Sequence, residues 1–458
     1  MDDTTQKKAI IIGAGIAGLS LAVRLQSKGI QVSVFEANKY PGGKLTELSK
    51  KGYRFDMGPS LFTMPQFVEE LFSISNKNIN HYFSYKKKET VCHYFYKDGT
   101  FFKASSDTDT FSSDAANVFD VKKNTLINYF KKSKKKYELT SSLFLEKSLH
   151  KISTYLSKDT LKAIFNVRNL DINISLHEYN TSNFDDPRLI QLFDRFATYN
   201  GSSPYLTPGI MSMIPHLEQY FGTFFPKGGM HSITESIYKL AQDLGVQFYF
   251  NSTVNRILVE NQIAVGVSVN KNEFHGDFII SNSDVVPTYK NLIKDQKPPL
   301  KILKQPRSSS ALIFYWGIKK EFPSLDLHNI FFSDNYEEEF TYIFEKKKVY
   351  NDPTIYVNIT SKENKSDAPK GCENWFVMVN VPSNIGQDWE TIINDVRNDV
   401  LNRLSDSLSV NLEELIEFET VLDPRLIESN TKSYQGALYG ASSNNKFAAF
   451  LRHPNFSQ

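Results

Sequence analysis

Residues 8–36 constrain the fold more than any other stretch of the chain. Lys8–Ile12 is a short, β-branched apolar run, typical of a buried parallel strand. Ile16–Ser27 carries apolar residues at helical spacing and ends before Gly29, and a second apolar run follows at Val32–Phe35. Because glycines mark the turn from the first run into the helical stretch, at Gly13, Gly15 and Gly18, the pattern predicts a β-α-β unit in an α/β fold.

The three glycines have the spacing G-x-G-x-x-G, and each has a separate role. Gly13 allows the tight turn, Gly15 lets a pyrophosphate approach the backbone, and Gly18 lets the helix pack on the strand. The helix start adds N–H groups and a partial positive charge. Glu36, 23 residues after Gly13, ends the second strand, where its carboxylate suits ribose hydroxyls and disfavours a 2′-phosphate. The predicted dinucleotide site is Gly13, Ala14, Gly15, Ile16, Ala17, Gly18, Glu36 and Ala37.

Two later motifs narrow the choice of dinucleotide. Pro41-Gly42-Gly43-Lys44 follows the ribose-binding acid, and Phe55-Asp56-Met57-Gly58-Pro59-Ser60 comes shortly afterwards. In these residues the sequence resembles the flavoprotein superfamily of amine oxidases and carotenoid desaturases, and Phe55–Pro65 is most similar to bacterial phytoene desaturases. The resemblance implies FAD as the cofactor. It implies FAD contacts at Gly42, Gly43, Lys44, Gly58, Pro59 and Ser60.

The resemblance continues along the chain and implies two interleaved domains. Phe225–Met230 leads into an amphipathic stretch, Ser232–Leu244, and then to Val254, whose backbone would contact the adenine. Phe278–Val286 is similar to a strand that returns to the FAD domain. The expected fold class is α/β, with a Rossmann-like FAD-binding domain interleaved with an α+β substrate domain. We expect the FAD domain at residues 1–75 and 225–290, the substrate domain at 76–224 and 291–435, and a return toward the FAD domain at 436–458.

The last residues also resemble this family, at Tyr434–Gly440 and Phe450–Asn455, and the chain stops at Gln458. The resemblance implies a second FAD-binding segment, rich in Gly, His and Pro, directly after this point. We therefore expect this chain to lack that segment, and an inactive truncated remnant stays open as an alternative.

Composition excludes several classes of ligand. The net charge of +2 gives no case for nucleic acid, and Cys92 and Cys372 make neither a metal-ligand cluster nor a disulfide framework. We predict no metal and a reducing, cytoplasmic location. Met1–Lys8 is polar, so no signal peptide is expected, and no apolar run of about 18 residues is present to cross a membrane.

A lysine cluster, Lys131–Lys136, lies in a stretch with helical spacing, Ala115–Tyr137. A solvated helix face commonly explains such a run. Contact with an anionic membrane is the alternative, supported by an apolar helical stretch over residues 143–165 and by a lipophilic carotenoid substrate. We therefore expect peripheral association with the membrane.

Other patterns predict further elements. We expect a helix at Pro65–Ser75 and a hairpin at His93–Phe102, with Asp98-Gly99 as a type I′ turn. Another helix begins near Asp186. The resemblance to desaturases implies that this region lies near the flavin, which makes Asp186 and Arg188 candidate catalytic groups; a helix cap with a surface charge is the alternative.

Apolar strands are expected between residues 300 and 430, at Ser310–Trp316, Ile355–Ile359 and Trp375–Val381. A helix at Ile392–Leu404 follows, with Asp388 as its N-cap. We expect these strands to floor a substrate tunnel, and a plain hydrophobic core is the alternative.

The chain has no second G-x-G-x-x-G, no H-E-x-x-H and no G-x-S-x-G, so the cofactor must carry the reaction. The resemblance implies desaturation of a long polyene by hydride transfer to the flavin in a dry channel, with a quinone or oxygen as electron acceptor. Gly43–Thr46 and Ser60–Met64 are closer to desaturases of hydroxylated carotenoids at the 3,4 bond. A carotene isomerase or an amine oxidase of the same fold stays an alternative.

Overall fold

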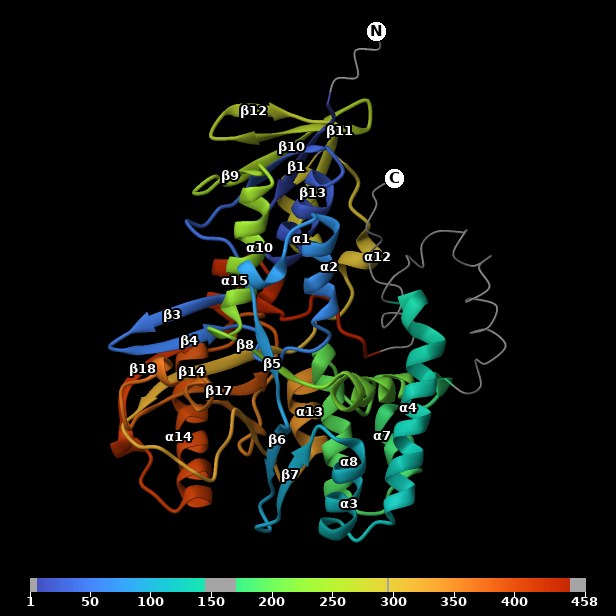
Figure 1. Cartoon of the computed structure of the whole chain (residues 1–458), viewed down its shortest axis with the longest axis vertical. Coiled ribbons are helices and arrows are strands. Elements are labelled where there is room, and N and C mark those ends of the chain that lie inside the picture. Colours follow the sequence, from blue (N-terminus) through green and yellow to red (C-terminus); the bar gives the residue numbers. More distant parts are fainter. Residues whose placement is uncertain (1–5, 145–169, 295, 445–458) are drawn as a thin grey trace.

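The structure is a computed structural model that describes residues 6–144, 170–294 and 296–444. A four-stranded parallel sheet, in the order β13-β1-β2-β9, forms the upper part of Figure 1. Ile11 of β1 pairs with Val34 of β2 and with Ile280 of β13, so the sheet joins two distant stretches of the chain. The strands are β1 (Lys8–Ile12), β2 (Gln31–Phe35), β9 (Gln247–Tyr249) and β13 (Phe278–Ser281).

Both faces of this sheet are covered, as expected of parallel strands. Ile11 packs with Leu19 and Ile237 of two helices, whereas Ile10 and Ile12 pack against a three-stranded antiparallel sheet. The predicted Rossmann-like α/β core is therefore confirmed. The covering elements are α1 (Ile16–Gln26), α2 (Gln66–Ile74) and α10 (His231–Asp243), and on the other face β10 (Val254–Glu260), β11 (Ile263–Val269) and β12 (Asn272–His275).

A seven-stranded sheet lies at the lower left of Figure 1, in the order β18-β14-β17-β16-β15-β6-β7. All neighbours are antiparallel except β15 and β6. The expected strands are confirmed, as is the helix capped by Asp388. The elements are β6 (Thr90–Phe95), β7 (Phe101–Ser105), β14 (Ser310–Ile318), β15 (His328–Phe331), β16 (Ile355–Asn358), β17 (Glu373–Val381), β18 (Ile416–Leu422) and α14 (Trp389–Leu408).

The central strand of this sheet is apolar on both faces. Leu312, Phe314 and Trp316 of β14 pack in one core, together with side chains of α14. Ala311 and Ile313 alternate with them and point to the opposite side, where a hairpin packs. The strands of that hairpin are β3 (Thr46–Lys50) and β4 (Tyr53–Met57).

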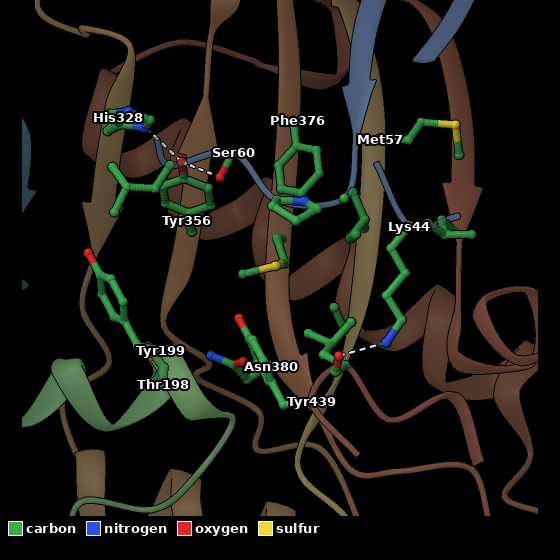
Figure 2. A pocket seen from close by; sticks show the side chains of 18 of the residues that line it. Lys44, Met57, Ser60, Thr198, Tyr199, His328, Tyr356, Phe376, Asn380 and Tyr439 are labelled. Carbon is green, nitrogen blue, oxygen red and sulfur yellow. Dashed lines mark hydrogen bonds between the residues drawn. The ribbon is translucent and has the colours of Figure 1, made fainter. Parts of the chain in front are cut away.

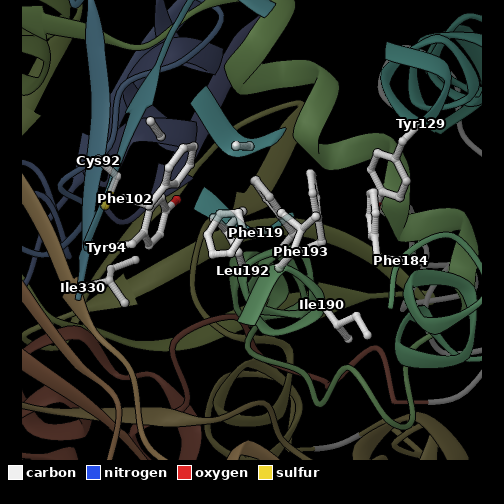
Figure 3. Close-up of a cluster of buried hydrophobic side chains, with 14 of the residues drawn as sticks. Cys92, Tyr94, Phe102, Phe119, Tyr129, Phe184, Ile190, Leu192, Phe193 and Ile330 are labelled. Atoms are coloured by element: carbon white, nitrogen blue, oxygen red, sulfur yellow. The ribbon is translucent and has the colours of Figure 1, made fainter. Parts of the chain in front are cut away.

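Helices form the lower right of Figure 1, around a core rich in aromatic rings (Figure 3). There Phe193 of α8 stacks on Phe184, and Tyr129 of α4 packs against both rings. This core fixes α8 and the segment that follows it, which reaches the site described below. The helices are α3 (Thr108–Val118), α4 (Lys123–Phe144), α7 (Leu176–Thr181), α8 (Pro187–Asp194) and α9 (Ile214–His216).

The single helix predicted over Ala115–Tyr137 is wrong, because α3 and α4 are separated by a turn at residues 119–122. The buried ring of Phe119 packs against Tyr96 and Phe102, and Asp120 takes a φ of 46°, in the left-handed region. A right-handed helix does not continue through that conformation. The apolar helix predicted over residues 143–165 lies, from residue 145 on, outside the described residues.

The predicted hairpin at His93–Phe102 is confirmed, but its type I′ turn is wrong. Type I′ needs a positive φ at both central residues. Gly99 has a φ of 85°, and Asp98 is not in the positive region. The Gly99 amide instead donates to the Tyr96 carbonyl oxygen, and the Tyr96 amide donates to that of Thr100. The loop is therefore longer, with Gly99 alone in the left-handed conformation.

The remaining elements connect these parts. A short antiparallel pair, β5 with β8, links the region after α2 to the start of α10. Among the described residues, none of the helices combines the length and the apolar character that crossing a bilayer requires. The domain boundaries given above stay a prediction. The connecting elements are β5 (Tyr85–Lys87), β8 (Phe224–Pro226), α11 (Val285–Pro287), α12 (Leu300–Leu303), α13 (Tyr336–Thr341) and α15 (Pro424–Thr431).

Candidate functional site

The glycine turn after β1 has the geometry of a phosphate-binding turn. Gly13 has a φ of 98°, and Gly15 is the N-cap of α1, so the N-cap residue has no side chain to bond to the helix start. A Cβ at Gly18 would lie 2.3 Å from the Gly13 carbonyl oxygen, so only glycine permits this approach. Ile16 and Ala17 form the first helical turn, whose amides and positive dipole end suit a pyrophosphate.

Glu36 lies at the end of β2, next to this turn. Its carboxylate is buried and accepts the Ala14 amide at 2.7 Å and the Asn38 amide at 2.8 Å. Ala37 is exposed, and Val254 is buried at the start of β10. The two backbone bonds hold the carboxylate at the sheet edge where ribose hydroxyls bind in folds of this kind.

The two later motifs fold against the first. The Gly42 amide donates to the Ala14 carbonyl oxygen at 2.9 Å. Gly58 has a φ of 103°, and a Cβ there would lie 1.9 Å from the Lys44 carbonyl oxygen, so no other residue fits. Three motifs that are separated in the sequence therefore meet at one edge of the parallel sheet.

Lys44 ties a distant segment to this edge, directly after Gly43. Its amine donates to the carbonyl oxygen of Leu438 at 2.6 Å and to that of Ala437 at 3.2 Å. Figure 2 shows Lys44 with one of these bonds. Burial lowers the pKa of Lys44 to about 8, although the Asp284 carboxylate opposes this shift. The two carbonyl oxygens partly replace the water that the buried cation has lost.

A cavity of about 620 Å³ opens beside these motifs (Figure 2). Part of its lining comes from the cofactor motifs, at Gly43, Lys44, Gly58, Pro59 and Ser60. Its wall includes the face of the seven-stranded sheet opposite α14, with Ala311, Ile313, Tyr356, Phe376 and Met378. The strands that we expected to line a substrate tunnel therefore form one wall of a largely apolar cavity.

A buried ion pair belongs to another part of the lining. A guanidinium nitrogen of Arg195 lies 2.9 Å from a carboxylate oxygen of Glu218, and the Tyr199 hydroxyl donates to the same carboxylate. The Arg195 guanidinium also lies 4.3 Å from the centre of the Phe196 ring. Burial raises the pKa of Glu218, and Arg195 opposes the rise, so each charge depends on its partner.

Three polar side chains form a hydrogen-bonded row in the cavity wall (Figure 2). Ser60 Oγ lies 2.8 Å from the Tyr356 hydroxyl, which lies 2.7 Å from His328 Nδ1. His328 is 3% exposed, and its Nε2 has no hydrogen-bond partner among the described residues. Burial lowers the pKa of His328 to about 3, so its ring is neutral at physiological pH.

Asp186 and Arg188 do not belong to this lining. Asp186 is the N-cap of α8 and accepts the amides of Arg188 and Leu189. Its carboxylate pairs with the Arg188 guanidinium at 2.7 Å, and Arg188 also pairs with Asp98 of the hairpin loop at 3.0 Å. These contacts support the capping alternative rather than a catalytic role.

Several lining residues were not singled out from the sequence. Arg195, Glu218, His328 and Tyr356 come from four separate segments, and none belongs to a short motif. One sequence signal could have identified such a lining residue: a polar or aromatic residue within an otherwise aliphatic strand, as Tyr356 is in β16.

The described residues contain no group of three or more His, Cys, Asp or Glu side chains that could hold a metal. They do fit FAD. The start of α1 is open, Cβ atoms are excluded where backbones approach, and a carboxylate stands at the ribose edge. With the flavoprotein motifs and the adjoining apolar cavity, these features define the class of the protein as a flavin-dependent oxidoreductase.

Comparison with known proteins gives the family. The model of the family described as flavin containing amine oxidoreductase matches residues 16–310, and the chain belongs to this family. FAD as the predicted cofactor is thereby confirmed.

Two relatives match along nearly the whole chain. The chain is 57% identical over 452 residues to 1-hydroxycarotenoid 3,4-desaturase of Flavobacterium sp. (strain P99-3), covering 99% of this chain and 92% of the relative. It is 30% identical over 457 residues to 4,4'-diaponeurosporene oxygenase of Staphylococcus aureus (strain USA300), covering 99% and 91%.

Solved structures share the fold at lower identity. An oxidoreductase from Methanosarcina mazei is 17% identical with a TM-score of 0.64, over 90% of this chain and 87% of that chain. Cyclohexylamine oxidase from Brevibacterium oxydans IH-35A is 14% identical with a TM-score of 0.60, over 97% and 90%.

Proposed function

We propose that this protein is a carotenoid desaturase that acts on a hydroxylated carotenoid at the 3,4 bond. The observation that carries the proposal is the identity of 57%, over 99% of the chain, with a protein named 1-hydroxycarotenoid 3,4-desaturase. The cavity supports it, because a largely apolar wall with aromatic rings suits a long polyene.

The residues of the chain would serve this reaction by orienting the polyene and excluding water. FAD, when bound, supplies the acceptor for the hydride. The rings of Tyr356 and Phe376, with the side chains of Ile313 and Met378, form an apolar wall next to the cofactor motifs. Such a wall would hold one C–C bond of the polyene in place. The second hydrogen leaves the neighbouring carbon as a proton. The polyene spreads the positive charge along its conjugated system and makes this carbon acidic, so a weak base suffices as the proton acceptor.

The test uses the purified protein, FAD and a 1-hydroxycarotenoid in detergent or vesicles. We expect the product to absorb at longer wavelength and to be lighter by two hydrogen atoms. A protein that binds FAD and the pigment but returns the substrate unchanged would contradict the proposal.

An oxygenase is a second candidate, favoured by the 30% identity with 4,4'-diaponeurosporene oxygenase. The same experiment separates the two, because an oxygenase product is heavier by oxygen. Mass spectrometry of the product under labelled oxygen therefore decides between loss of hydrogen and gain of oxygen.

We further propose that the protein works in the cytoplasm, on the membrane surface that holds its substrate, with a quinone or oxygen as the final electron acceptor. The helix α4 supports surface binding, because its exposed lysines can attract anionic lipid. One lysine of the cluster is different: Lys136 is buried and lies 2.8 Å from an Asp171 carboxylate oxygen. The exposed lysines are Lys131, Lys132, Lys134 and Lys135.

A further inference from the structure

In the row formed by Ser60, Tyr356 and His328, the contacts around His328 determine which group donates and which accepts in each hydrogen bond. Asn358 Nδ2 lies 2.9 Å from the carbonyl oxygen of Leu327, which only accepts, so the amide nitrogen of Asn358 occupies this position. The same nitrogen faces His328 Nδ1 at 3.2 Å. Two donors do not face one another, so Nδ1 carries no proton. The proton of the neutral ring is therefore on Nε2.

This tautomer orients both hydroxyl groups of the row. Because His328 Nδ1 only accepts, the Tyr356 hydroxyl donates to it across 2.7 Å. Ser60 then donates to the Tyr356 oxygen across 2.8 Å. The row ends at the Ser60 oxygen, which lines the cavity and accepts from no group of the described residues. The cavity therefore presents a hydrogen-bond acceptor at this point.

The position of Ser60 matches the chemistry of the proposed substrate. Carbon 1 of such a substrate lies two bonds from the 3,4 bond, so a group that binds its hydroxyl must lie next to the cofactor residues. Ser60 directly follows Gly58 and Pro59 of the FAD motif. The other strong polar pair of the lining, Arg195 with Glu218, comes from other elements, and its two charges pair with each other. The buried Nε of Arg195 has no partner among the described residues, but it can only donate, so it offers no acceptor for a hydroxyl proton.

We propose that Ser60, oriented by Tyr356 and His328, accepts a hydrogen bond from the substrate hydroxyl and makes this cavity selective for a hydroxylated polyene end. The inference rests on the proposed function. An alcohol that enters an apolar cavity loses water and needs a new partner. A hydrocarbon end leaves the Ser60 acceptor unpaired. A methyl ether keeps the oxygen but has no proton to donate.

The test compares three polyenes that differ only at carbon 1: the alcohol, its methyl ether and the hydrocarbon. Binding to the purified protein is measured by quenching of tryptophan fluorescence, and desaturation by absorption. We expect the wild type to prefer the alcohol about 10-fold over both others, in Kd and in kcat/KM. Ser60→Ala should reduce this preference to about two-fold or less. Because Ser60 also belongs to the FAD motif, the comparison uses the ratio between the three polyenes, measured on FAD-loaded protein.

Tyr356→Phe gives a separate signature. Without the phenol oxygen, the Ser60 hydroxyl proton loses its acceptor and can turn toward the ligand. This variant should therefore bind the methyl ether about as well as the alcohol. Tyr199→Phe is the matched control, because it removes a hydroxyl elsewhere in the lining and should leave the ratio of the three affinities unchanged. Thermal unfolding and FAD content show that each variant is folded.

Two outcomes overturn the inference. Equal affinity of the wild type for the three polyenes is one, and an equal loss for all three in Ser60→Ala is the other. The proposed function fails separately, if the wild type binds the alcohol selectively but desaturates none of the compounds. Equal desaturation of all three, without selective binding, would support the function and contradict the inference.

Discussion

At the scale of single residues, Gly18 tests the close packing under the cofactor turn. Alanine is better than glycine inside a helix by about 1 kcal/mol. Here its Cβ would lie 2.3 Å from the Gly13 oxygen and 2.7 Å from Asn282 Nδ2, so α1 would have to move. We expect Gly18→Ala to lower the free energy of unfolding by about 2 kcal/mol, measured by urea denaturation, and to reduce bound FAD. Ser20→Ala, in the same helix, should change it by less than about 0.5 kcal/mol.

Lys44 gives a pH-dependent prediction at the same scale. Burial lowers its pKa to about 8 from the ordinary 10.5. Between these values the unfolded chain holds a proton that the folded chain has released, so the wild type gains stability as pH rises. The gain relative to Lys44→Met should approach about 3 kcal/mol by pH 10.5. Denaturation of both proteins at several pH values measures the difference, and a constant difference would contradict the burial of the amine.

Residue roles could be predicted where they depend on local backbone geometry. The φ of Gly13, the close approach at Gly18 and the place of Glu36 follow from one short segment. Tyr356 and His328 could not be found this way. Tyr356 bonds to Ser60, 296 positions away, and such a pairing leaves no local pattern.

At the scale of elements, β14 and β17 were predictable as strands, but their orientation was not. Every residue of β14 is buried, so the period of two shows no polar face. Only the packing shows that one face lies under α14 and the other lines the cavity. The turn between α3 and α4 was missed for a related reason, because helical spacing continues across Asp120.

Truncation of a side chain to alanine should change the free energy of unfolding by different amounts on the two faces of this sheet. Phe314→Ala, in the core under α14, should lower the free energy of unfolding by about 3–5 kcal/mol. Met378→Ala, on the cavity face, should lower it by only about 1 kcal/mol, because its side chain already borders empty space. The main effect of Met378→Ala should be weaker binding of the polyene, measured by quenching of tryptophan fluorescence. Similar losses of stability in both variants would contradict this division.

At the scale of the whole molecule, the interleaving of segments came from resemblance rather than from local pattern. Nothing near Phe278–Ser281 shows that it pairs with Lys8–Ile12, because parallel partners can be any distance apart in the sequence. The same holds for the cavity, which exists only where the cofactor motifs meet the seven-stranded sheet. The proposed substrate is long and apolar, so its route to the cavity depends on the outer surface of the molecule, and the proposed membrane contact is tested there.

The exposed lysines of α4 give the prediction that belongs to this scale. Replacing Lys131, Lys132, Lys134 and Lys135 together by glutamine should weaken binding to vesicles with anionic lipid by about 10- to 100-fold, since each lysine near the surface contributes about 1 kcal/mol at most. Cosedimentation measures the binding. Added salt should release the wild type and affect the variant much less, because screening acts only on the charge attraction.

The control removes the same charge elsewhere on the surface, by glutamine at Lys319, Lys320, Lys365 and Lys370, which are also exposed. It should bind anionic vesicles as the wild type does. If both quadruple variants lose binding alike, net charge rather than the α4 surface attracts the lipid. If neither loses binding, the lysines form the solvated helix face of the simpler explanation, and the carotenoid must enter by another surface.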